Sequence, residues 1–261
     1  MKRSSWQIQK AVLFALMLRE LKTRFGGRLI GLLWVLFEPM AHIAVMLALR
    51  IILRERTAGV MIDVAVYLVV AMIPFFMFRN IWFRMMQAVE ANAGLFGYRQ
   101  VKPADAMASR AMIEIVMYTM IFVAFMLVFA WMEYRITPAR PLEYLAMILL
   151  FVIWGVGLGL MSAVGVKKFP ALGSFLQLTS FPLYISSGVL IPIHNFPPTV
   201  IQYLMWNPLL HMVELTRWSY FPTYHPLMGV NLNYPLVVGM VLLFLGVAVF
   251  WVNRQRVLVR R

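Results

Sequence analysis

Six long apolar stretches divide the sequence, and most of the charged residues lie between them. A helix that crosses the hydrocarbon core of a bilayer needs about 20 mostly apolar residues, because each residue adds about 1.5 Å to its length. The six stretches are of about this length. They predict transmembrane helices over residues 29–52, 64–86, 107–132, 144–166, 171–191 and 234–252. We therefore expect an all-α polytopic membrane protein.

The first 27 residues have a different pattern, in which apolar and basic positions recur at helical spacing. The basic side chains that suit an anionic headgroup layer are Arg19, Lys22, Arg24 and Arg28. We predict that 1–27 forms an amphipathic interfacial helix. The apolar run 11–18 is short enough for a signal peptide, but no A-x-A site follows, so we expect it to be retained. Gly26 and Gly27 permit a sharp turn, and we predict a gate there.

Composition and charge distribution support a membrane protein and indicate its orientation. The chain is 62% hydrophobic and carries a formal net charge of +14, whereas soluble domains are about half apolar. Lys and Arg gather in the N-terminal segment, in alternate connections and at the C-terminus, which is typical of cytoplasmic loops. This distribution predicts that both termini are cytoplasmic. It also explains the basic charge without nucleic acid as a partner.

The sequence lacks the motifs of several kinds of chemistry. It has no cysteine, which excludes disulfides and thiol catalysis. Its acidic residues never form a D-x-D pair, so a membrane glycosyltransferase is disfavoured, and its four histidines show no metal-ligand spacing. No G-x-x-x-x-G-K-[ST] loop occurs. We expect no metal or cofactor in this chain, and ATP and Mg²⁺ on a separate subunit.

Two connections carry more apolar residues than a solvated loop needs. Segment 88–103 contains glycines that permit turns, and its apolar side chains suggest a cytoplasmic coupling helix that docks a partner. Its candidate contact residues are Glu90, Leu95, Phe96, Tyr98 and Arg99. Segment 192–233 contains short apolar helix-like runs. We predict periplasmic re-entrant helices there, between the fifth and sixth spans.

Two groups of motifs resemble a known family. The first reads R-E-L-K-T-R-F at 19–25, then L-I-G-L-L-W at 29–34, then E-P at 38–39. The second is a serine-glycine pair late in the fifth span, followed by N-P-L at 207–209 and E-x-x-R at 214–217. Together they resemble ABC-2-type permeases, and most closely the inner-membrane permeases that export capsular polysaccharide.

The resemblance implies a single ABC-2-type transmembrane domain over 1–261, without enzymatic activity of its own, in the bacterial inner membrane. The implied partners are a second copy of the chain, two copies of an ATP-binding subunit, a periplasmic polysaccharide co-polymerase and membrane lipids. The polymer path would lie at the permease dimer interface, lined by the first and fifth spans. O-antigen, teichoic acid or a small molecule stay alternative cargoes, and a passive channel is an alternative from another class.

A path for a lipid-linked, anionic polysaccharide needs flat aromatic faces for sugar C–H groups and arginines for carboxylates or phosphates. The candidate path residues are Arg28, Trp34, Phe37, Glu38, Arg79, Arg84, Tyr184, Ser186 and Ser187. Arg79 lies deep in the second span, where an arginine is costly. It contacts the polymer, pairs with Glu38 or Glu114, or snorkels to the interface.

Several polar or small residues have a simpler interpretation. Arg84 and Arg110 lie near the ends of spans and fit snorkelling. Glu214 and Arg217 are three residues apart, which favours a local ion pair. Gly155 and Gly159 form a G-x-x-x-G motif, for which packing within the chain is favoured over a dimer contact.

Overall fold

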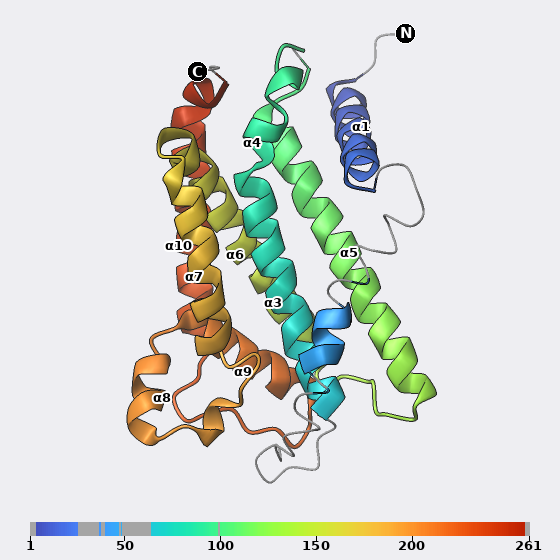
Figure 1. The fold of residues 1–261 in the computed structure, drawn as a ribbon, viewed down its shortest axis with the longest axis vertical. Helices are drawn as coiled ribbons and strands as arrows, with labels where there is room; N and C mark the ends of the chain where they lie inside the picture. The colour runs from blue at the N-terminus through green and yellow to red at the C-terminus, as the bar shows by residue number, and fades with distance from the viewer. Residues whose placement is uncertain are drawn as a thin grey trace.

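Helix α3 (Val64–Met86) lies at the centre of the structure, a computed structural model that describes residues 4–25, 37, 40–46, 48, 64–98 and 100–258. Figure 1 shows α3 between its neighbours in an all-helical bundle, and the described residues include no strand. The other elements are α1 (Ser5–Phe25), α4 (Ala88–Ala91), η1 (Ala93–Leu95), α5 (Pro103–Trp131), α6 (Pro141–Lys168), α7 (Ala171–Ser186), η2 (Ile193–Asn195), α8 (Pro198–Leu204), α9 (Pro208–Tyr220) and α10 (Asn233–Leu258).

Four helices within the described residues, α3, α5, α6 and α10, are long and apolar enough to cross a membrane. They occupy four of the six positions that the sequence predicts for spanning helices. The first predicted span, 29–52, lies largely outside the described residues. The fifth differs from its prediction.

Helix α7 has 16 residues and ends at Ser186, so the predicted continuous helix over 171–191 is wrong at its C-terminal end. Its length of about 24 Å is less than the roughly 30 Å of a hydrocarbon core. The chain leaves the helix at Gly188, whose φ is +71°. A Cβ at that position would lie 2.5 Å from Ile193 Cγ1, so the turn requires glycine.

Helix α6 approaches both of its main neighbours through glycines. A Cβ added at Gly155 or Gly159 would lie 2.9 Å or 2.7 Å from side-chain atoms of α3. On another face of α6, a Cβ added at Gly246 of α10 would lie 2.6 Å from the carbonyl oxygen of Gly157. Small residues allow helix backbones to come this close. The prediction that the Gly155–Gly159 motif serves packing within the chain is confirmed.

The segment from 192 to 233 folds into η2, α8 and α9, followed by a loop to α10. Figure 1 places α8 and α9 at the end of the molecule opposite α4. Helix α9 packs against α3, α6 and α10. The start of α9 is determined locally, because Asn207 Oδ1 accepts a hydrogen bond from Leu209 N at 3.0 Å and Pro208 occupies the first helical turn.

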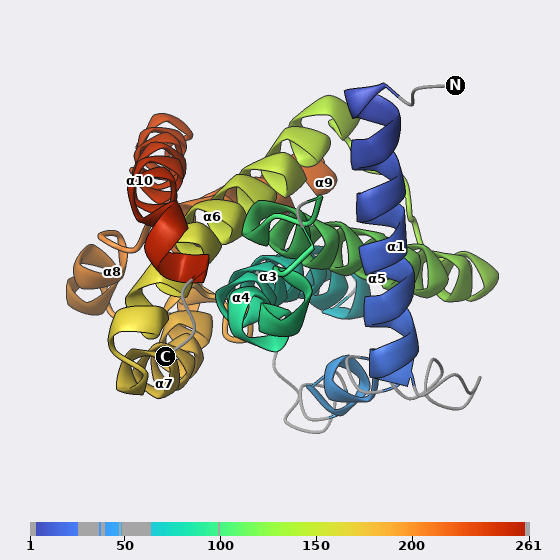
Figure 2. The ribbon, with the colours of Figure 1, turned by 90° about the horizontal axis from the view of Figure 1, so that it is seen from above.

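Helix α1 lies across the bundle rather than along it. It is foreshortened in Figure 1 and extends along its full length in the view from above in Figure 2. Its apolar residues Met17 and Leu21 pack against Ile113 and Met117 of α5. The start of α1, the end of α10 and α4 lie at the same end of the molecule (Figure 1).

Candidate functional site

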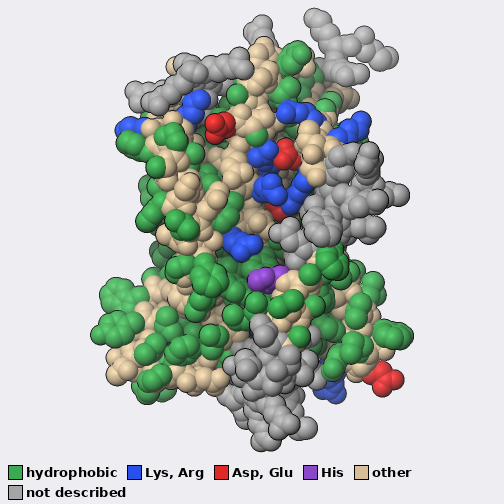
Figure 3. Space-filling view, viewed as in Figure 1, with side chains coloured by type: hydrophobic (Ala, Val, Ile, Leu, Met, Phe, Trp, Pro, Cys, Tyr) green, Lys and Arg blue, Asp and Glu red, His purple; other side chains and the backbone are tan. Residues whose placement is uncertain are grey.

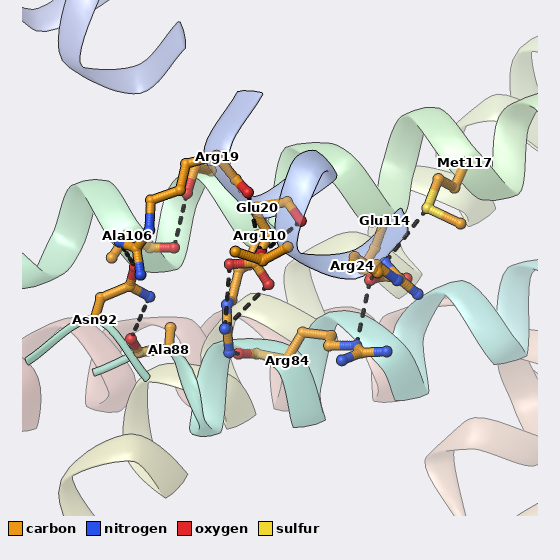
Figure 4. Close-up of polar contacts among 12 residues, drawn as sticks. Arg19, Glu20, Arg24, Arg84, Ala88, Asn92, Ala106, Arg110, Glu114 and Met117 are labelled. Carbon is orange, nitrogen blue, oxygen red and sulfur yellow. Dashed lines mark hydrogen bonds and ion pairs between the residues drawn. The ribbon is translucent and has the colours of Figure 1, made fainter. Parts of the chain in front are cut away.

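The carboxylate of Glu114 joins three helices in the structure. It lies within apolar α5 and is 1% exposed. Arg24 of α1 places its Nη1 2.5 Å from Glu114 Oε1, and Arg84 of α3 places its Nε 3.6 Å from the same oxygen (Figure 4). A buried carboxylate without such partners is strongly unfavourable, so α1 completes the environment of Glu114.

Arg110 of α5 makes a second connection to α1. Its Nη2 lies 3.0 Å from Glu20 Oε1, and its Nη1 donates to the carbonyl oxygen of Arg84 at 3.2 Å. Arg110 is buried and ion-paired, so the snorkelling predicted for it is wrong. Arg84 remains partly exposed but also takes part in an ion pair. We name this group the α1 cluster; it comprises Glu20, Arg24, Arg84, Arg110 and Glu114.

The predicted coupling helix over 88–103 is two short helical segments, α4 and η1, followed by turns before α5 begins at Pro103. Its apolar side chains do not share one face. Phe96 is half-buried against the core, Leu95 lines a cavity beside α1, and Tyr98 is 67% exposed. Glu90 is exposed, whereas Arg99 lies outside the described residues.

Helix α1 is hydrogen-bonded to Asn92 of this segment and to Asp105 in the first turn of α5. Arg19 Nη1 donates to Asn92 Oδ1 at 2.9 Å (Figure 4), and Gln9 Nε2 donates to Asp105 Oδ1 at 2.5 Å. Between these two contacts lies a cavity of about 470 Å³. It is lined by Ile8, Ala11, Val12, Ala15, Leu16, Arg19, Leu95, Gln100 and Val101. The prediction for this segment did not include Asn92.

Among the described residues, Arg79 faces an aromatic ring and no carboxylate. Its guanidinium carbon lies 4.8 Å from the centre of the Phe76 ring. Tyr184 stacks on Phe76 at 5.4 Å, and His42 meets it edge-on at 5.3 Å. Figure 3 shows basic side chains on this face of the molecule, with a histidine below them. Glu114 forms ion pairs with Arg24 and Arg84, so the predicted Arg79–Glu114 pair is wrong. In the described part of the chain, Arg79 has no ion pair.

The two serines predicted for the polymer path contact the N-P-L motif. Asn207 Nδ2 donates to Ser186 Oγ and to Ser187 Oγ, both at 3.0 Å. Ser187 is fully buried, and its hydroxyl also donates to the carbonyl oxygen of Leu183. The structure thus brings together residues 20 positions apart in the sequence.

Arg217 and Glu214 form the local ion pair that their spacing predicts, with 3.7 Å between Arg217 Nη1 and Glu214 Oε1. Both side chains are 0% exposed, which the spacing did not indicate. Arg217 also donates to the carbonyl oxygens of Gly188 at 2.8 Å and Val189 at 2.9 Å. It therefore holds the turn that ends α7.

Two tyrosines complete this site. Arg217 lies over the Tyr67 ring at 3.9 Å, and the Tyr224 hydroxyl donates to Glu214 Oε1 at 2.8 Å. Burial, together with the charge of Glu214, raises the pKa of Tyr224 well above its ordinary value. The hydroxyl therefore stays protonated and able to donate. We name this group the α9 cluster; it comprises Tyr67, Glu214, Arg217 and Tyr224.

Several predicted site residues lie outside the described residues, namely Gly26, Gly27, Arg28, Trp34, Glu38 and Arg99. Their roles in a gate, a polymer path and a coupling surface stay predictions. Phe37 is described and exposed. Among the described residues, no group of three or more His, Cys, Asp and Glu side chains could hold a metal ion.

The sequence is similar to a family of membrane transporters. Residues 11–221 match the ABC-2 type transporter family. The chain is 38% identical over 266 residues to the polysialic acid transport protein KpsM of Escherichia coli, with 99% of each chain covered.

Two further relatives are capsule polysaccharide export inner-membrane proteins. CtrC of Neisseria meningitidis serogroup A is 30% identical, with 93% of this chain and 91% of CtrC covered. BexB of Haemophilus influenzae is 26% identical, with 84% and 82% covered. The family match covers most of the sequence, and the similarity to KpsM extends over nearly all of it. The chain therefore belongs to the ABC-2 type transporter family.

Proposed function

We propose that this chain is the permease subunit of an ABC transporter that exports capsular polysaccharide across the bacterial inner membrane. The observation that carries the proposal is the similarity to KpsM, which covers 99% of both chains. CtrC and BexB, named for capsule polysaccharide export, are similar over most of their lengths. The four long apolar helices agree with a membrane-embedded subunit.

The energy for export comes from a separate ATP-binding subunit. The sequence has no phosphate-binding G-x-x-x-x-G-K-[ST] loop, so ATP and Mg²⁺ bind to the partner. We propose two copies of that partner beneath two copies of this chain. The exposed Tyr98 and Glu90 are available to contact it, whereas Phe96 is half-buried and stabilises the segment from within.

The end of the molecule that carries α4 and η1 is proposed to face the cytoplasm, with both chain termini. The abundance of Lys and Arg in the N- and C-terminal segments supports this orientation. Helices α8 and α9 would then lie at the periplasmic side, where α9 is buried against the bundle and the exposed residues of α8 would face the outer leaflet. A periplasmic co-polymerase would meet the permease on this side.

The polymer is proposed to be lipid-linked and anionic, and to pass between two permease subunits along the first and fifth spans. Arg79 is the best described candidate for contact with it. Its charge has no ion pair in the described part of the chain, and neighbouring aromatic rings offer flat faces for sugar C–H groups. Arg84, Ser186 and Ser187 have partners within the protein and fit a structural role better.

Deletion of the gene in its native host tests this function. We expect surface polysaccharide to disappear and the same polymer to accumulate inside the cell, and a plasmid copy to restore export. Unchanged surface polysaccharide would contradict the proposal. If O-antigen, teichoic acid or resistance to a small molecule is lost instead, that cargo replaces the capsule. Export that persists when the partner cannot hydrolyse ATP would indicate a passive channel.

A further inference from the structure

We propose that Asn92 and Arg19 form a positioning link through which movement of the coupling segment, residues 88–102, carries α1 with it. This inference rests on the proposed function, because it assumes that the ATP-binding subunit acts on this segment. The link is a hydrogen bond between residues 73 positions apart, so nothing local requires it.

Asn92 is attached on both sides of its amide. Its Oδ1 accepts from Arg19 of α1, and its Nδ2 donates to the carbonyl oxygen of Ala88 at 2.8 Å. The residue is 4% exposed and lies between α4 and η1. A buried amide with both ends bonded has one orientation, so a displacement of α4 displaces the acceptor of Arg19.

A second contact secures the other end of the segment. Asp105 Oδ2 accepts from the backbone nitrogen of Lys102 at 3.0 Å, and its Oδ1 accepts from Gln9 of α1. Positions 9 and 19 are about 15 Å apart along a helix. Helix α1 is therefore hydrogen-bonded to residues on both sides of η1 and the turns that follow it, in addition to the ion pairs that Glu20 and Arg24 make with α5.

The space between the two contacts is not tightly filled. The cavity of about 470 Å³ lies between apolar residues of α1 and Leu95, Gln100 and Val101 of the segment. A close-packed interface resists displacement, because any shift creates clashes or voids. The cavity leaves room for α1 to shift relative to the segment, so the Arg19–Asn92 hydrogen bond is what would make the two move together.

The first test replaces Asn92 in the full transporter, together with its ATP-binding subunit. Asn92→Leu keeps the side-chain size and removes both hydrogen bonds. We expect normal abundance and co-purification, ATP hydrolysis within about twofold of wild type and export lowered by about tenfold or more. Asn253→Leu is the matched control, because Asn253 also donates to a carbonyl four residues earlier at 2.8 Å, but in α10. Normal export in Asn92→Leu would overturn the proposal.

The variant Asn92→Asp distinguishes the hydrogen bond to Arg19 of α1 from the hydrogen bond to the carbonyl of Ala88. The carboxylate can still accept from Arg19 but cannot donate to the Ala88 carbonyl. Export close to wild type supports the link to α1. Export as low as in Asn92→Leu, with wild-type abundance, shows that only the local bond matters and overturns the link.

The absence of cysteine in the chain allows a decisive test that does not depend on the folding of a single variant. In the double variant Arg19→Cys with Asn92→Cys, export should be low when the thiols are free. A short reducible thiol-specific linker should restore export, and reductant should remove it again. Bridged protein that stays inactive, or unbridged protein that exports normally, overturns the proposal. If wild type itself exports no polysaccharide, the proposed function fails instead.

Discussion

The α9 cluster and the α1 cluster both contain arginine–glutamate ion pairs, but the pairs differ in sequence separation and burial. Glu214 and Arg217 are three residues apart on one helix and have no exposed surface. The α1 cluster joins positions 90 residues apart on different helices, and Arg84 is partly exposed. The first arrangement fixes a turn, whereas the second attaches one helix to a bundle.

The difference has an energetic consequence. When a fully buried ion pair loses one partner, the remaining charge has no route to water. The α1 cluster instead includes Arg84, which is partly exposed, so a charge that loses its partner there lies closer to water. We therefore expect the α9 cluster to control abundance and the α1 cluster to control the position of α1.

The largest effect is expected for Arg217→Met. It strands the buried Glu214 carboxylate and removes the donors to the Gly188 and Val189 carbonyls. The loss of stability should be about 3–5 kcal/mol, so the permease should nearly disappear from the membrane. Immunoblotting of membrane fractions and thermal stability in detergent measure this. The double variant Arg217→Met with Glu214→Gln should recover part of the abundance, and no recovery would show that the stranded charge is not the cause.

A smaller effect is expected for Glu114→Gln. The amide still accepts a hydrogen bond from Arg24, but the charge attraction to Arg24 and Arg84 is lost. We expect destabilisation of about 1–3 kcal/mol and greater release of α1 than of the bundle. A cysteine introduced at Leu16, which is 6% exposed, should then react faster with a water-soluble maleimide. Equal reactivity in wild type and variant would show that the α1 cluster does not hold α1.

Arg79 belongs to neither cluster, and we expect its replacement to lower export while leaving the stability of the permease nearly unchanged. Because Arg79 contacts the Phe76 ring and no carboxylate in the described part of the chain, Arg79→Ala should lower stability by only about 0.5–1 kcal/mol. Export of an anionic polymer should fall, and Arg79→Lys should restore it only in part, because lysine lacks the bidentate fork. A marked loss of abundance would instead indicate a buried pair. Normal abundance with normal export would leave snorkelling as the role of Arg79.

The smallest effect on stability is expected for Tyr98→Asp. The side chain is exposed and lies outside the core, so abundance should be unchanged. Co-purification of the ATP-binding subunit should decrease if this residue contacts it. Phe96→Asp is the contrasting variant, because it inserts a charge into a half-buried site and should lower abundance as well. Unchanged binding of the subunit in Tyr98→Asp would remove this residue from the coupling surface.

The sequence by itself determined the helical class, the positions of α3, α5, α6 and α10, and the family. These properties depend on local apolar content and on short motifs, which can be read without knowing how helices are rotated. The Glu214–Arg217 pair belongs to the same class, because three residues on a helix bring two side chains to one face. The Gly155–Gly159 motif likewise indicated close packing before its neighbour was known.

Only the tertiary structure decided which distant residues meet. In the sequence, Glu114 is an acidic residue within an apolar run, and nothing there indicates its ion pair with Arg24 of α1. Nothing in the sequence indicates the hydrogen bond between Asn92 and Arg19 either. The early end of α7 depends on the contact between Gly188 and Ile193, and on Arg217 from another helix. Such contacts depend on the rotation and spacing of whole helices. Those are determined by packing over many residues at once, and no local pattern records them.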